Sequence, residues 1–148
     1  MKYSQGNIGR VFVARAEHGD NLLEEIKKLA KKEKIETGVM YVIGALKDAS
    51  FVVGPKECNL PPVPVWRKFD DGREIIGIGT LFQDEQGPVL HLHGAFGKGD
   101  QALMGCIRDL SEVYLVAEVI LLELTGTGAF KKFEEESGLK MINFLSPA

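Results

Sequence analysis

His91 and His93 are two of only three histidines in the chain, and a single residue separates them. They fall within residues 88–96, an apolar stretch with the character of a strand. Alternate side chains on a strand share one face, so both imidazoles point the same way, with Cβ atoms about 7 Å apart. Neutral imidazole is a good ligand for zinc and related divalent metal ions. The pair predicts either a metal site or two half-buried rings satisfied by hydrogen bonds, and spacing alone leaves both interpretations open.

Two imidazoles alone make a weak metal site, so the first interpretation requires a third ligand. The chain offers few side chains of the right chemistry, namely a histidine, two cysteines and a carboxylate: His18, Cys58, Cys106 and Glu118. The residue types by themselves do not decide among these four.

Other segments that could do chemistry have simpler interpretations. Residues 97–100 (GKGD) lack the spacing and the Lys-Ser/Thr ending of a phosphate-binding loop, and residues 126–128 (GTG) lack the third glycine of a dinucleotide fingerprint. Both are interpreted as turns. The sequence contains no Gly-x-Ser-x-Gly motif, and the paired acids Asp70 and Asp71 precede a glycine, as in a solvated loop. No reaction is identified, and whether the protein is an enzyme is left open.

One main helix is predicted over residues 20–34, because apolar residues recur there at helical spacing. Asp20 is expected to cap its first turn. Acidic residues come early in the helix and basic residues late, which suits the helix dipole. The basic residues form a lysine face, interpreted as the solvated back of an amphipathic helix with phosphate binding as the alternative. It comprises Lys27, Lys28, Lys31, Lys32 and Lys34.

Most of the remaining chain is predicted to form strands. Residues 74–83 and 88–96 form a hairpin, and residues 113–124 are nearly all apolar, as expected for a strand covered on both faces. Residues 130–137 are predicted to form a short helix that ends at Gly138. Further strands are expected at residues 11–14, 39–45, 49–53 and 140–145, and a proline-rich loop at residues 54–66. This order predicts an α+β fold with a central, largely antiparallel sheet, one main helix and one short helix, in a single domain over residues 1–148.

Composition excludes several classes of protein. The chain has 148 residues, 45% hydrophobic and 26% charged, which is typical of a globular protein. Its formal net charge is −3, which argues against a protein built mainly to neutralise a nucleic-acid backbone. Residues 1–10 have no apolar core, so no signal peptide is expected, and residues 113–124 are too short to cross a bilayer. We expect a cytoplasmic protein without a membrane partner.

Three stretches together resemble the PPC (plants and prokaryotes conserved) domain family, a domain of unknown function. They are residues 72–81 (GREIIGIGTL), 90–97 (LHLHGAFG) and 117–124 (AEVILLEL), and the segment from Val11 to Leu46 fits the same pattern. The resemblance covers nearly the whole chain. It implies an α+β fold with a central antiparallel sheet, and it implies homotrimers. It also implies a link to DNA, because plant members carry an AT-hook before the domain, but this sequence contains no such element.

The resemblance also implies a metal site. Similar prokaryotic members carry the paired histidines, matched here by His91 and His93, and a later Gly-Gly-His-Leu element whose histidine position is occupied here by Cys106. A cysteine thiolate can replace imidazole as a zinc ligand, so the resemblance favours Cys106 over His18 as the third ligand. The expected function is a trimeric protein that binds a divalent metal ion, zinc above all. The alternative is a DNA-associated or regulatory module that uses the lysine face, or a trimeric scaffold whose histidines are only hydrogen-bonded.

Overall fold

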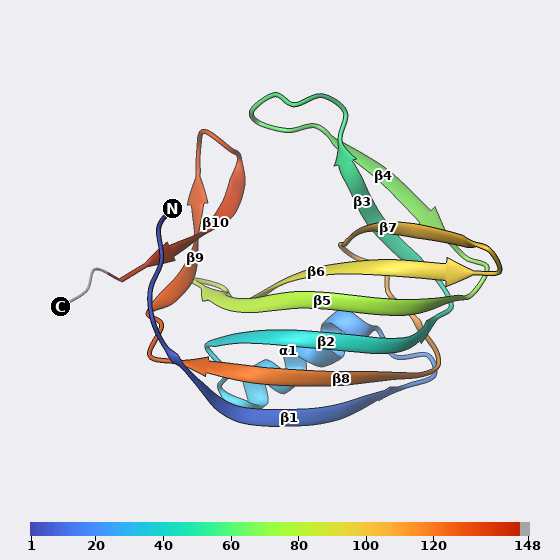
Figure 1. The fold of residues 1–148 in the computed structure, drawn as a ribbon, viewed down its shortest axis with the longest axis horizontal. Coiled ribbons are helices and arrows are strands. Elements are labelled where there is room, and N and C mark those ends of the chain that lie inside the picture. Colours follow the sequence, from blue (N-terminus) through green and yellow to red (C-terminus); the bar gives the residue numbers. More distant parts are fainter. Residues whose placement is uncertain (146–148) are drawn as a thin grey trace.

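The computed structural model describes residues 1–145, and Figure 1 shows their path. Strands dominate, and one helix packs on a face of the larger sheet. The elements in chain order are β1 (Asn7–Glu17), α1 (Leu22–Glu33), β2 (Thr37–Leu46), β3 (Ala49–Pro55), β4 (Pro64–Phe69), β5 (Arg73–Asp84), β6 (Gly87–Lys98), β7 (Gln101–Ile107), β8 (Val113–Thr125), β9 (Ala129–Glu134) and β10 (Leu139–Phe144).

The larger sheet has eight strands in the order β1-β8-β2-β5-β6-β7-β3-β4, and all its neighbouring strands are antiparallel. A smaller sheet pairs β9 with β10. The predicted α+β fold with a largely antiparallel sheet is confirmed, as is the β5–β6 hairpin. That hairpin turns tightly because Asp84 Oδ1 accepts hydrogen bonds from the backbone amides of Gln86 and Gly87. Among residues 1–145, no helix has the length and apolar character needed to cross a membrane.

The helix α1 forms where the apolar periodicity predicts it, but its cap lies one residue later than expected. The side chain of Asn21, not that of Asp20, accepts a hydrogen bond from the Glu24 amide, at 3.2 Å. Asp20 is instead engaged in the turn after β1, where its Oδ2 accepts from the Glu17 amide at 2.8 Å. The helix ends at Glu33, and the left-handed backbone of Lys34 (φ 54°) caps its last turn.

The hydrophobic core lies between α1 and the inner face of the larger sheet, and Figure 1 shows α1 crossing behind β2 and β8. Along the central strands of the larger sheet, alternate residues point into this core, so that Val119 and Leu121 of β8 are buried while Ile120 between them is exposed. The expectation that residues 113–124 are covered on both faces is therefore wrong for the single chain. Its second face carries apolar side chains that are exposed to solvent in the single chain, among them Tyr114 and Ile120.

The short helix predicted over residues 130–137 is wrong. Residues 129–134 form the strand β9, which pairs with β10 from Leu139 opposite Glu134 to Phe144 opposite Ala129. The lysines and glutamates of this segment are good helix formers, but six cross-strand pairs outweigh that local preference. The segment reverses at Gly138, whose φ of 65° suits a turn.

Candidate metal centre

His91 and His93 lie on β6, in the middle of the larger sheet, and their rings project from the same face, as predicted. The Nε2 atoms are 3.0 Å apart, and the ring centroids are 4.9 Å apart with an interplanar angle of 70°. Both side chains are on the face opposite α1, which we call the outer face, whereas Leu92 between them is fully buried in the core. The strand alternation alone therefore brings two potential ligands together.

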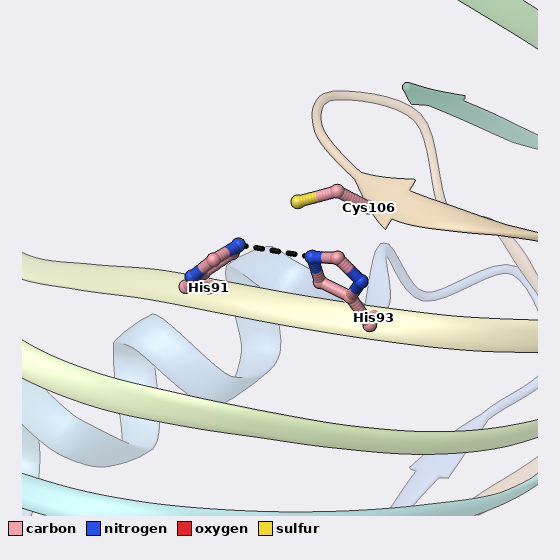
Figure 2. A group of neighbouring side chains, drawn as sticks. All are labelled: His91, His93 and Cys106. Atoms are coloured by element: carbon pink, nitrogen blue, oxygen red, sulfur yellow. Dashed lines mark hydrogen bonds between the residues drawn. The ribbon is translucent and has the colours of Figure 1, made fainter. Parts of the chain in front are cut away.

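Cys106 completes a group of three. It lies on β7 directly opposite His93, and residues that face each other across an antiparallel pair point to the same side of the sheet. The two imidazoles and the Cys106 sulfur each offer a ligand atom, and these atoms all lie within 4.8 Å of one another. Figure 2 shows the sulfur above the facing nitrogens of His91 and His93.

These separations and donor types fit a zinc ion. Zinc–nitrogen bonds of about 2.0 Å and zinc–sulfur bonds of about 2.3 Å place the ligand atoms of a tetrahedral site roughly 3.3–3.7 Å apart. The nitrogen pair at 3.0 Å and the whole group within 4.8 Å reach that range after small side-chain rotations. Three protein ligands would leave one coordination position open.

The other candidate ligands lie elsewhere. His18 follows β1 and accepts a hydrogen bond from the Leu115 amide through Nδ1, at 3.2 Å, while its ring packs edge-on against Tyr114. Glu118 lies on β8 opposite Arg15, and Cys58 is exposed in the loop between β3 and β4. Of the four candidates for a third ligand, only Cys106 joins the histidine pair.

Burial sets the protonation of the group. Partial burial lowers the pKa of His91, and the nearby charges of His93, Lys131 and Arg108 lower it further. Burial also raises the pKa of the Cys106 thiol, with Arg108 acting in the opposite direction. At neutral pH, His91 is therefore a neutral imidazole ready to donate a lone pair, and Cys106 is a thiol that must lose its proton to become a ligand.

Glycines allow the strands around the site to pack closely against their neighbours. A Cβ atom on Gly79 would lie 2.9 Å from the backbone oxygen of His91, and one on Gly105 would lie 2.6 Å from that of Val52. Both distances are shorter than real side chains adopt. Gly79 therefore marks a close approach between β5 and β6, and Gly105 marks one between β7 and β3.

The site is continuous with an apolar surface that sequence reasoning missed. One row of directly opposed residues crosses the outer face from strand to strand: Val13, Ile120, Tyr41, Ile78, His93 and Cys106. The adjacent row contains Ile43 and Ile76. Ile76 is 69% exposed and Ile78 is 58% exposed. The available signal for this surface was the alternation in β5, which places Ile76 and Ile78 on one face and Gly77 and Gly79 on the other.

Solved structures share this fold. A metal-containing protein of Archaeoglobus fulgidus is 24% identical with a TM-score of 0.84, and the match covers 95% of this chain and 98% of that one. A plant- and prokaryote-conserved (PPC) protein of Pyrococcus horikoshii is 28% identical with a TM-score of 0.84, covering 99% and 100%. A protein of Ralstonia eutropha described as a candidate DNA-binding protein is 19% identical with a TM-score of 0.76, covering 90% of each chain. No curated protein matches the chain.

The sequence model of one family matches residues 3–125. This range contains the whole larger sheet together with His91, His93 and Cys106. The chain therefore belongs to the Plants and Prokaryotes Conserved (PCC) domain family, also written PPC.

Proposed function

We propose that this protein is a homotrimeric metal-binding protein in which His91, His93 and Cys106 hold a zinc ion. The observation that carries the proposal is the convergence of three ligand atoms from two adjacent strands to within 4.8 Å of one another. A described metal-containing protein among its structural neighbours also supports it.

The donor set favours zinc among the divalent metals. Two imidazoles and one thiolate are borderline to soft ligands, which zinc accepts readily and which magnesium and calcium avoid. A thiolate ligand also fits a reducing compartment, so we place the protein in the cytoplasm. Zinc with an open position acts as a Lewis acid toward water or a bound ligand.

The homotrimer is supported by the outer face. Tyr41, Ile43, Ile76 and Ile78 form adjacent exposed positions on β2 and β5, and large contiguous apolar patches are rare on monomers. Two further copies of the chain are the partners that the family resemblance implies. In such an assembly the outer face of each subunit is covered, and the histidine pair lies at or beside the contact.

Elemental analysis of protein purified without a histidine tag tests the metal site. We expect about one zinc ion per chain in the wild type and almost none in the double variant His91→Ala and His93→Ala. His18→Ala is the matched control, because it removes the third histidine and should leave the metal content unchanged. An unchanged metal content in the double variant, or a metal-free wild type after zinc loading, would reject the site.

DNA association is the second candidate function, and it is supported by the neighbour described as a candidate DNA-binding protein. The lysine face is partly neutralised, because Lys27 pairs with Glu24 at 2.8 Å and Lys28 pairs with Glu25 at 2.5 Å. We therefore rank this function below metal binding. A mobility-shift assay at low salt tests it, and binding should weaken steeply as salt is added.

A further inference from the structure

Lys131 extends over the outer face next to the candidate metal site. Its Nζ lies 5.8 Å from the centre of the Phe82 ring. Phe82 stands two residues beyond Thr80 on β5, and Thr80 is directly opposite His91. Side chains at these positions share one face, so Lys131 covers the outer face one same-face position along β5 from Thr80, the residue opposite His91. Lys131 reaches this position because it lies on β9, and the β9–β10 hairpin stands beside the end of β5 in Figure 1. Phe82 lies near that end of β5.

Arg108 approaches the same site from the other neighbouring strand. It lies just past the end of β7, two residues after Cys106, and its amide donates to the Ser50 backbone oxygen of β3 at 3.1 Å. This bond continues the strand pairing, so alternation directs the exposed Arg108 side chain to the face that carries the sulfur. Its charge acts on both potential ligands, lowering the pKa of His91 and opposing the rise in the pKa of Cys106. The charge of Lys131 also acts on His91.

Among the residues that the structure describes, no carboxylate pairs with either of these two cations. Within residues 1–145, neither Lys131 nor Arg108 takes part in a salt bridge, whereas Arg10, Arg15 and Arg73 each do. Lys131 is also partly buried, so its charge is incompletely solvated. A divalent ion held by two neutral imidazoles and one thiolate adds one more net positive charge. An anion at this place would reduce this concentration of positive charge.

We propose that the open coordination position takes a small oxyanion, a carboxylate or a phosphate group, whose remaining oxygens are bound by Lys131 and Arg108. The planar guanidinium matches the paired oxygens of such groups, and the ammonium supplies a point charge. This inference rests on the proposed metal site and names the class of ligand that the site selects.

The test uses cobalt(II)-loaded protein, whose visible absorption spectrum changes when a ligand enters the open position. Inorganic phosphate and acetate are the anionic probes, and free imidazole is the neutral one. We expect the wild type to bind at least one anion, and Lys131→Met to weaken that binding by about tenfold, as loss of a charge-assisted hydrogen bond does. Imidazole binding should be unaffected. Methionine is an unbranched apolar side chain of similar length, so it can still cover the Phe82 ring and the hairpin should remain folded.

Matched variants test whether the loss of anion binding depends on the charge of Lys131 and on its position. Lys132→Met removes the neighbouring charge from an exposed position and should leave anion binding unchanged, while Lys131→Arg should retain it. Arg108→Gln should weaken anion binding as Lys131→Met does. If cobalt binds but neither phosphate nor acetate alters the spectrum, or if Lys131→Met binds anions as the wild type does, the inference fails and the metal site survives. If cobalt itself does not bind, the proposed function fails. The comparison of phosphate with acetate identifies the preferred oxyanion.

Discussion

His93 and Cys106 face each other directly across the β6–β7 pair, although thirteen positions of chain separate them. Their Cα partnership places the sulfur and the imidazole on the same side of the sheet. A shift of the pairing by one residue would turn Cys106 toward the opposite face and destroy the group. The geometry of the site therefore depends on strand register more than on any local motif.

Replacing Cys106 tests its role as the third ligand. Cys106→Ala should weaken zinc affinity by more than the about 10- to 100-fold loss seen when a group that only orients a ligand is removed. Cys106→His should retain tight binding, because it restores the three-histidine set that the family resemblance implies for similar members. Competition with a chromophoric chelator measures both affinities. Cys58→Ala is the control, since that thiol is exposed in a distant loop. Equal affinities in the wild type and Cys106→Ala would exclude the sulfur as a ligand.

Zinc binding should release about one proton per site at pH 7. Burial raises the pKa of Cys106, so the free protein carries a thiol there, and it lowers the pKa of His91, so that ring has no proton to lose. The apparent affinity should accordingly rise by about tenfold per pH unit while the thiol is protonated in the free protein. Calorimetry in buffers of different ionisation enthalpy counts the released protons. Cys106→His, whose ligand would be neutral, should release almost none, and release of a proton by that variant would contradict the assignment.

The histidine pair and the main helix could be predicted from sequence because both depend on local periodicity. Alternation places His91 and His93 on one face, and the recurrence of apolar residues defines α1. The partnership of Cys106 with His93 depends on register between two strands, which residue types did not reveal. Only the family resemblance singled out Cys106 before the structure brought the three residues together.

The wrong predictions share a physical cause. In β9, helix-forming lysines and glutamates occupy a strand because β10 pairs with them, and local propensity contains no information about that partner. In β8, a continuous apolar run suggested two covered faces, but only the inner face meets the core of this chain. An apolar residue that is covered only by another chain has the same sequence signature as one that is buried in the core of its own chain.

Introducing a charge on the outer face tests the proposed homotrimer. Ile76 is 69% exposed and lies opposite Ile43 and Ala95, away from the ligand row. Ile76→Glu would bury a carboxylate in the contact, so the variant should be monomeric where the wild type is trimeric. Light scattering coupled to size exclusion measures the mass. Val63→Glu, at an equally exposed position in the β3–β4 loop, should leave the trimer intact. A trimeric Ile76→Glu or a monomeric wild type would contradict the interface.

Gly44 permits the close contact between β2 and β8. Its φ is 135°, and a Cβ atom there would lie 2.4 Å from the backbone oxygen of Val116. Gly44→Ala combines this clash with an unfavourable backbone conformation, so it should lower the free energy of unfolding by about 3 kcal/mol. Urea unfolding at fixed protein concentration measures the change. Gly97→Ala is the control, because a Cβ there meets nothing within 4 Å, and it should change stability by less than about 0.5 kcal/mol.

The Arg10–Glu123 ion pair should make stability depend on acid pH. Glu123 accepts hydrogen bonds from Arg10 Nε and Nη2, each at 2.8 Å, and from the Arg10 amide, and these lower its pKa to about 2. In the unfolded chain the carboxyl titrates near its ordinary value of about 4.3. The pair therefore stabilises the fold fully above that pH, and its contribution disappears as the pH falls toward 2.

We expect Glu123→Gln to be less stable than the wild type by about 1 kcal/mol at pH 7, with the difference shrinking below pH ~4. Urea unfolding across this range measures it, and Glu85→Gln, the same change at an exposed turn, is the matched control. A difference between wild type and Glu123→Gln that stays constant from pH 7 down to the acid limit would mean that the carboxylate charge contributes nothing to the fold.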